Sequence, residues 1–154
     1  MGIYRIDEQQ LIPASIEEVW DFISNPENLS TITPDSMGFK ITTPDLPEKM
    51  YPGMMVSYRV KPLLGIPLTW LTEITHIQEM RYFVDEQRKG PYALWHHEHF
   101  IESTRNGVQM RDIVTYKLPL GFLGGIAHRL FVRKQLRRIF DYRTEALEKR
   151  FGRP

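Results

Sequence analysis

WHHEHF at residues 95–100 and MRDIVTY at residues 110–116 stand on either side of Asn106-Gly107, the strongest short-range signal for a β-hairpin. We expect a two-residue turn at this dipeptide, with the two runs paired as antiparallel strands. Because successive strand residues point to opposite faces, His96 and Glu98 should lie on the outer, more polar face. The inner face should carry Trp95, His97, His99, Ile101, Met110, Asp112, Val114 and Tyr116.

Most of the chain before this hairpin also has the pattern of strands. Ser15 and Glu18 have the spacing of a capping box, which predicts a helix start, and Asn25-Pro26 predicts a second short helix that ends near Ser30. These two helices follow a first alternating strand at residues 3–12. The remaining strands are expected at residues 39–42, 54–60, 68–77 and 82–87.

The C-terminal part predicts one long amphipathic helix over about residues 122–150. Arg143 is the single charged residue in its apolar stripe. Because an unpaired buried charge is costly, we expect Arg143 to reach Asp112 or Asp85 on the sheet, or to meet the acidic head of a ligand. The rest of the stripe consists of Val132, Leu136, Ile139, Phe140, Ala146 and Leu147.

This order of elements predicts an α+β fold with one domain over residues 1–154. A curved antiparallel sheet of about seven strands should wrap on the long C-terminal helix, with the two short helices after the first strand. Helix and sheet would enclose a space suited to a ligand.

Composition excludes several kinds of function. The chain has no cysteine, which removes disulfides, thiolate metal sites and cysteine nucleophiles. Its 20 lysine and arginine residues nearly balance 19 aspartate and glutamate residues, so we expect no nucleic-acid partner. Residues 1–8 lack the apolar core of a signal peptide, and no run is long enough to span a membrane. We therefore expect a cytoplasmic protein, either a monomer or a homodimer.

Several runs resemble the SRPBCC superfamily, the START-like and birch-pollen-allergen-like helix-grip fold. They are YFVDEQ at residues 82–87, GPY at 90–92, WHHEH at 95–99, MRDIVTY at 110–116 and LPLG at 118–121. The closest branch resembles the polyketide cyclase/dehydrase-like ligand-binding group, and the likeness covers nearly the whole chain. It implies a cavity and not a particular reaction, because this superfamily includes lipid carriers, hormone receptors, cyclases and co-chaperones.

Our main hypothesis is therefore binding of a hydrophobic or amphipathic small molecule, or a lipid, between sheet and helix. Apolar and aromatic side chains would supply most of the affinity, and His97, His99, Asp112 and Arg143 would orient a polar group. The expected ligand-binding residues are Tyr58, Trp70, Phe83, Asp85, Trp95, His97, His99, Asp112, Tyr116 and Arg143.

Three interpretations of His97, His99 and Asp112 remain open. They are polar residues of a cavity wall, or acid/base groups of a cyclase or dehydratase acting on a polyketide-like substrate, or a 2-His-1-carboxylate metal site. The resembled family is not generally metal-dependent, so we expect no metal and no cofactor. No nucleophile or oxyanion device can be identified beside the histidines, which makes a non-catalytic binding protein the favoured interpretation.

A further alternative is an interaction module that contacts a membrane transiently or docks a protein. It would use the apolar turn Pro62–Pro67 and the start of the C-terminal helix, where basic and apolar residues alternate without an acid. Such a basic cluster is more often simply solvated. The basic residues are Arg129, Arg133, Lys134, Arg137 and Arg138, and the apolar ones are Phe122, Leu123, Ile126 and Leu130.

Overall fold

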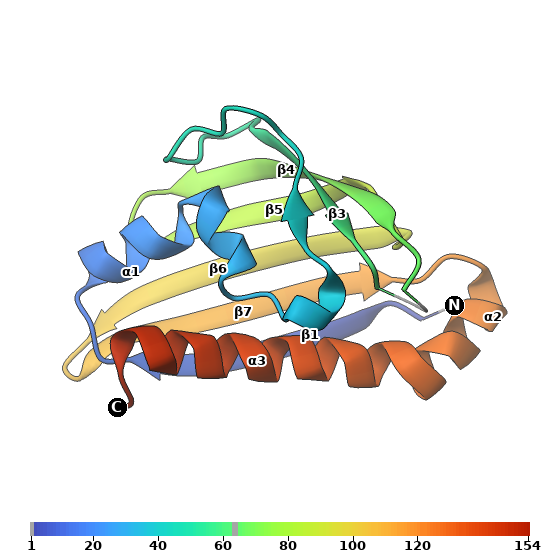
Figure 1. Cartoon of the computed structure of the whole chain (residues 1–154). Coiled ribbons are helices and arrows are strands. Elements are labelled where there is room, and N and C mark those ends of the chain that lie inside the picture. Colours follow the sequence, from blue (N-terminus) through green and yellow to red (C-terminus); the bar gives the residue numbers. More distant parts are fainter. Residues whose placement is uncertain (1, 63–64) are drawn as a thin grey trace.

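The computed structural model describes residues 2–62 and 65–154, and within them one curved antiparallel sheet wraps around a long C-terminal helix (Figure 1). Leu63 and Leu64, in the predicted turn Pro62–Pro67, lie outside the described residues. The sheet has seven strands within these ranges. They are β1 (Tyr4–Ile12), β2 (Lys40–Ile41), β3 (Met55–Val60), β4 (Leu68–Gln78), β5 (Tyr82–Lys89), β6 (Leu94–Thr104) and β7 (Gly107–Lys117).

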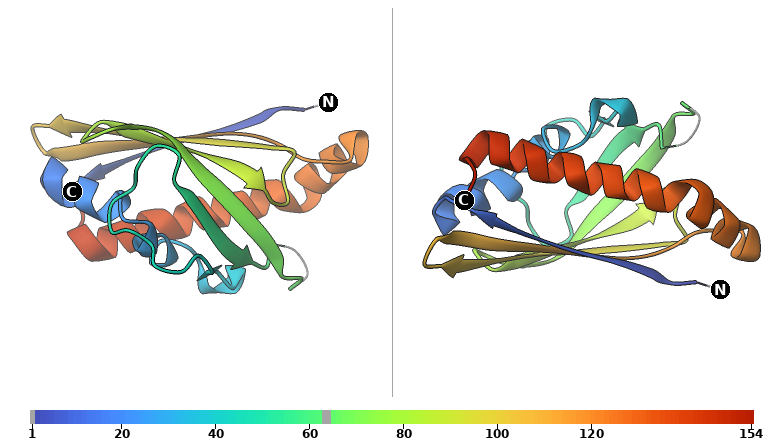
Figure 2. Two further views of the ribbon diagram at one scale, coloured as in Figure 1. Left: turned by 90° about the horizontal axis from the view of Figure 1, so that it is seen from above. Right: turned by 90° about the horizontal axis from the view of Figure 1, so that it is seen from below.

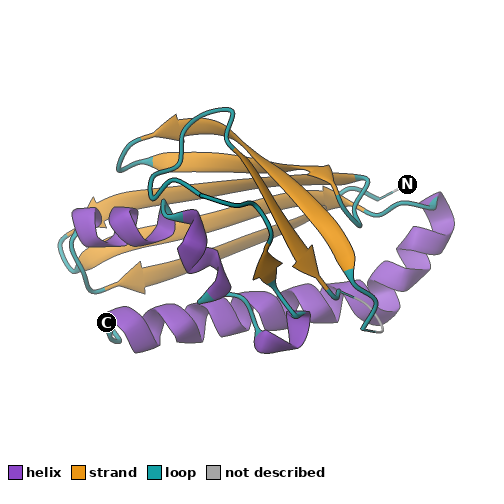
Figure 3. Cartoon of the chain, turned by 45° about the horizontal axis from the view of Figure 1, so that its top comes forward, coloured by secondary structure: helices purple, strands orange, loops and turns teal. Residues whose placement is uncertain are grey.

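Strand order in the sheet is β1-β7-β6-β5-β4-β3-β2, so every neighbouring pair except β1 and β7 is consecutive in the chain. The helices lie on one face of this sheet, with α3 crossing it and α1 covering one end (Figures 2 and 3). The α+β fold predicted from the sequence is therefore confirmed. The helical segments are α1 (Ile16–Ile23), the 3-10 segments η1 (Pro26–Ser30) and η2 (Asp35–Met37), α2 (Gly121–Ala127), the π-helical η3 (His128–Val132) and α3 (Arg133–Phe151).

Local signals account for both helical regions. Both hydrogen bonds of the capping box are present in α1, because the Ser15 side chain accepts from the Glu18 amide while the Glu18 carboxylate accepts from the Ser15 amide. The C-terminal helix begins and ends close to the prediction, but η3 divides it into two α-helical parts. The apolar stripe is on the inner side of α3, where Leu136, Phe140 and Leu147 are buried.

The hairpin turn lies one residue earlier than predicted. Its central residues are Arg105 and Asn106, and Thr104 pairs with Gly107. The Thr104 hydroxyl accepts from the Asn106 amide at 3.3 Å and donates to the Gly107 carbonyl at 3.0 Å, which stabilises this tighter turn. The prediction that the turn is centred on Asn106-Gly107 is wrong, but the faces are unchanged because the pairing moves by two residues.

A glycine is required at position 107 because strand β1 lies close to it, and not because of the turn. Its φ is 133°, and a Cβ on this residue would lie 2.2 Å from the carbonyl oxygen of Ile12 in the adjacent β1. The absence of a side chain at Gly107 thus lets β1 approach the hairpin and complete the sheet.

We expect Gly107→Ala to lower the free energy of unfolding by more than about 3 kcal/mol, because it adds a backbone clash to an unfavourable φ. Gly53→Ala is the matched control, since Gly53 has a φ of 91° and a Cβ added there would meet no atom within 4 Å. That control should cost only about 1–2 kcal/mol. Urea denaturation of both variants measures the difference, and equal losses would contradict the role of the Ile12 contact.

Candidate functional site

A cavity lies between the sheet and α3. Its volume of about 160 Å³ is close to the roughly 150 Å³ in which a buried apolar cavity holds benzene. Eight of the ten predicted ligand-binding residues line it, namely Tyr58, Trp70, Phe83, Asp85, Trp95, His97, His99 and Arg143. Asp112 and Tyr116 are not part of its lining; Asp112 lies against the histidines, and the Tyr116 hydroxyl is hydrogen-bonded to His128 Nε2 at 2.8 Å.

Aromatic side chains form one end of the cavity. Trp70 of β4 stacks on Tyr58 with ring centroids 5.8 Å apart and meets Trp95 edge-on at 5.2 Å. Its indole N–H donates to the Thr72 hydroxyl at 3.0 Å, so the polar edge of this ring is satisfied inside the protein. Tyr92 completes this wall, at 5.6 Å from Trp70.

Sequence reasoning missed the part of the wall that comes from loops. Tyr92 follows Gly90-Pro91, where the sequence indicates only a turn, and many of the other missed residues lie in or near the short helices and the segments around β2. Those in loops have no periodic pattern, so their only sequence signal is that they are large and apolar. The missed residues in this part of the chain include Phe22, Leu29, Ile32, Met37, Phe39 and Met50.

The polar floor of the cavity is organised by Asp112 of β7. One of its oxygens, Oδ1, is 3.0 Å from His97 Nε2, 2.9 Å from His99 Nδ1 and 3.2 Å from Arg143 Nη2. Burial acts to raise the pKa of Asp112, but the Arg143 charge and the two histidines outweigh it and hold this pKa well below its usual range. Arg143 therefore reaches one of the two carboxylates expected from the sequence.

His99 is held between two carboxylates. Its Nε2 is 2.6 Å from Asp85 Oδ2, and its Nδ1 faces Asp112 Oδ1. Ionised carboxylates only accept hydrogen bonds, so the imidazolium form of the ring suits both contacts. Arg143 Nη2, which can only donate, lies 3.3 Å from the same Nδ1. Burial acts to lower the pKa of His99, but the hydrogen bonds with Asp112 and Asp85 outweigh it and raise this pKa. Two carboxylates thus face the Arg143 guanidinium and a histidine whose pKa they raise.

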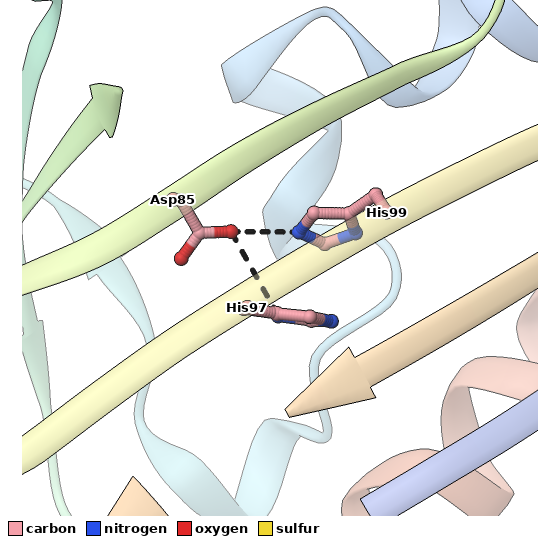
Figure 4. Close-up of side chains that lie close together, drawn as sticks. All are labelled: Asp85, His97 and His99. Atoms are coloured by element: carbon pink, nitrogen blue, oxygen red, sulfur yellow. Dashed lines mark hydrogen bonds and ion pairs between the residues drawn. The ribbon is translucent and has the colours of Figure 1, made fainter. Parts of the chain in front are cut away.

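His97 is neutral beside this imidazolium. Burial and the positive charge of His99 lower the pKa of His97 to about 4. Its Nε2–H donates to Asp112, which leaves a lone pair on Nδ1, 3.8 Å from Asp85 Oδ2. Figure 4 shows Asp85 reaching from β5 toward both histidines of β6. Two hydrogen-bond acceptors therefore face each other at the cavity; Asp85 Oδ2 already accepts from His99, whereas His97 Nδ1 has no donor among the described residues.

The same groups include a candidate set of metal ligands. Asp85, His97 and His99 each offer a ligand atom, all within 4.8 Å of one another. The carboxylate in this set is Asp85, whereas the metal hypothesis from the sequence used Asp112. The donor set fits a proton better than a dication, because His99 already bridges two carboxylates and the Arg143 guanidinium would repel a metal ion.

No family model matches the chain, and no curated protein matches its sequence. Solved structures do match its fold. TTHA0849 from Thermus thermophilus is 17% identical with a TM-score of 0.72, over 96% of this chain and 97% of that one. A START superfamily protein from Mycobacterium smegmatis is 14% identical with a TM-score of 0.68, over 97% of both chains. The chain has the START-like helix-grip fold.

CV1439 from Chromobacterium violaceum supports the same assignment, with 11% identity and a TM-score of 0.72 over 98% of this chain and 99% of that one. The fold implied by the sequence resemblance is thereby confirmed. At these identities the likeness concerns the fold alone, and a fold of this kind is compatible with many functions. None of the helices in the described part of the chain is both long and apolar enough to cross a bilayer.

The histidines generate a prediction about pH. The pKa of His97 is about 4 in the folded protein against 6.5 in the unfolded chain. Between these values only the unfolded chain binds the proton, so acidification favours unfolding by up to about 1.4 kcal/mol per pH unit. His99 adds no slope in this window, because its raised pKa keeps it protonated in both states.

His97→Gln tests this interpretation, because its amide still donates to Asp112 but does not titrate. We expect the free energy of unfolding of the variant to fall less steeply than that of the wild type between pH 6.5 and 4. Urea denaturation at several pH values measures both slopes. Parallel slopes would show that His97 is not held neutral.

Arg143 generates a second prediction about stability. Arg143→Met leaves Asp112 and Asp85 buried with a single cation, and we expect a loss of about 3–5 kcal/mol. Arg138→Met, at an exposed position of the same helix, should change stability by less than about 0.5 kcal/mol. Adding Asp112→Asn to Arg143→Met should restore part of the loss, because it removes the uncompensated charge. Chemical denaturation of the three variants measures these free energies of unfolding, and an equal loss in Arg143→Met and Arg138→Met would contradict the prediction.

Proposed function

We propose that this protein binds an uncharged amphipathic small molecule that donates a hydrogen bond, through a hydroxyl or N–H group, into the gap between His97 and Asp85. The observation that carries the proposal is the pair of acceptors facing each other across 3.8 Å at the floor of an otherwise largely apolar cavity. Asp85 Oδ2 already accepts from His99, so the acceptor that lacks a donor among the described residues is His97 Nδ1. A buried acceptor without a donor is costly, and a ligand donor that reaches this lone pair removes that cost.

The rest of the cavity supports a compact apolar body on this ligand. Trp70, Phe83 and Trp95 present ring surfaces, and α3 adds Leu136 and Ile139 from the opposite side. Each Å² of apolar surface that the ligand removes from water contributes about 25 cal/mol. A volume of about 160 Å³ suits a body of one or two rings better than an extended acyl chain.

Charge on the ligand is disfavoured. An acidic headgroup would need a cation whose charge is not already balanced. Arg143 Nη2 lies 3.2 Å from Asp112 Oδ1, so the charge is balanced, although the buried Nε has no hydrogen-bond partner among the described residues. The Asp85 carboxylate lines the cavity and would repel an anion. This arrangement argues against the acidic ligand that the sequence left open for Arg143, and in favour of a neutral donor.

Binding without catalysis is the better supported function. A general base works best with a pKa near the operating pH, and burial lowers the pKa of His97 to about 4. The ring nitrogens of His99 are both engaged within the protein, Nε2 by Asp85 and Nδ1 by Asp112 and Arg143, so neither is open to a substrate proton. Neither histidine has the properties that a cyclase or dehydratase would require of its base at neutral pH.

Phenol, toluene and benzoate are matched probes of this proposal, since they share a ring and differ in the polar group. We expect phenol to bind at least about threefold more tightly than toluene, the value of one modest hydrogen bond. Benzoate should bind most weakly of the three. Chemical-shift titration followed by NMR measures all three affinities.

Two variants separate the hydrogen bond from the apolar contacts. His97→Leu should abolish the preference for phenol, whereas Ile139→Ala should weaken phenol and toluene by a similar factor and keep their ratio. Circular dichroism confirms that each variant is folded before titration. Tighter binding of benzoate, or equal binding of phenol and toluene by the wild type, would overturn the proposal.

A further inference from the structure

The helical segment before α3 carries an exposed apolar surface. Half of the exposed large hydrophobic side chains in the described residues lie between Leu120 and Phe131. Phe122 is 77% exposed, Leu130 62% and Phe131 60%, values unusual for side chains of this size on a helix packed against its own domain. We call this surface the apolar patch, and it consists of Leu120, Phe122, Leu123, Ile126, Leu130 and Phe131.

The opposite side of the same segment is firmly attached to the sheet. Gly124, His128 and Val132 are buried at intervals of four residues. His128 stacks on Tyr4 with ring centroids 3.5 Å apart and is hydrogen-bonded to the Tyr116 hydroxyl. The segment therefore cannot turn over to bury the apolar patch without losing these contacts.

The position of the segment leaves the apolar patch accessible. The segment α2 lies at the edge of the molecule beyond the ends of the strands (Figures 1 and 2), and the side chains of the apolar patch are exposed there among the described residues. An apolar face held outward on a docked helix indicates a partner that is itself apolar at the point of contact.

Charge around the apolar patch is of one sign. No acidic residue occurs between Asp112 and Asp141, a stretch that contains every residue of the patch. Arg129, Arg133, Lys134 and Arg138 are exposed there, and none of them forms an ion pair with another described residue. Arg137 is the exception, because it is paired with Glu8 of β1.

We propose that this segment docks the protein on an anionic phospholipid bilayer, with the apolar patch inserted at the interface and the neighbouring arginines and lysine on the headgroups. A helix that presents aromatic and aliphatic side chains beside a basic border, without acids, has the amphipathic character of interfacial helices. Anionic lipid supplies the negative charge that the chain itself does not provide in this region.

A second copy of the chain fits this surface less well. Two copies related by a twofold axis would bring the same basic residues together, and these have no acidic partners within the patch. An anionic bilayer accounts for both features of the surface, since it buries the apolar side chains and neutralises the basic ones.

Docking would also bring the cavity close to the lipid. Gln135, one helical turn after Phe131, lines the cavity, and its side-chain amide donates a hydrogen bond to the Pro62 carbonyl. This part of the cavity wall would therefore lie near the headgroups when the apolar patch is inserted. The docking proposal does not depend on which ligand the cavity holds.

Co-sedimentation of the full chain with vesicles tests the proposal. We expect binding to vesicles of phosphatidylcholine and phosphatidylserine in equal amounts, and little binding to phosphatidylcholine alone. The double variant Phe122→Ser/Phe131→Ser should weaken binding to the mixed vesicles by about tenfold or more, because two aromatic anchors are lost. Replacing Arg129 and Lys134 by glutamine should weaken it by about fivefold per residue and reduce its sensitivity to salt.

The control variant is Tyr51→Ser/Arg105→Gln, which removes an exposed aromatic and a basic residue outside the patch and should bind as the wild type does. Sedimentation velocity without lipid identifies a competing explanation. A dimer that Phe122→Ser/Phe131→Ser abolishes would show that a second copy covers the patch and would overturn the proposal. Equal binding to neutral and anionic vesicles, or unchanged binding by the patch variants, would also overturn it.

Discussion

The contact on which the site depends is the convergence of His97, His99 and Arg143 on one oxygen of Asp112. It joins β6, β7 and α3 through polar and charged groups that are all buried. Replacement of such a cluster by well-packed apolar residues is often neutral or stabilising, so its presence is weak evidence of a contribution to stability. Its geometric effect is clearer, because it fixes where the helix lies over the sheet and places polar groups at the floor of the cavity.

Residues on a common face were predictable from the sequence even where the exact pairing was not. Alternation in a strand has a period of two, so His97 and Asp112 stay on one face in any register that differs by an even number of residues. The turn moved from Asn106-Gly107 to Arg105-Asn106, and the inner face was unchanged. Arg143 was predictable for a related reason, since a charge within an apolar helical stripe must find a partner.

Other features depend on contacts between distant parts of the chain and had no sequence signal. Met37 ends the short 3-10 segment η2 and Phe39 lies just before β2, and these segments are too short for a periodic pattern to indicate which side chain is buried. Tyr116 was expected in the cavity wall, but its hydroxyl is hydrogen-bonded to His128 of the π-helical segment. The sharing of Asp112 by His99 and Arg143, with Asp85 on the other side of His99, is likewise a property of three-dimensional placement, because both carboxylates are within reach of the same face.

The two neighbouring histidines show how such placement decides chemistry. His97 and His99 are two residues apart on β6, with ring centroids 3.7 Å apart, yet their pKa values move in opposite directions. Two imidazolium ions at this separation would repel each other strongly in a buried site, so positive charge on one ring lowers the pKa of the other. The pKa of His99 is the one that rises, because both carboxylates lie within 2.9 Å of its nitrogens, whereas Asp85 is 3.8 Å from His97. The lone pair that His97 presents at the cavity is therefore a consequence of the proton on its neighbour.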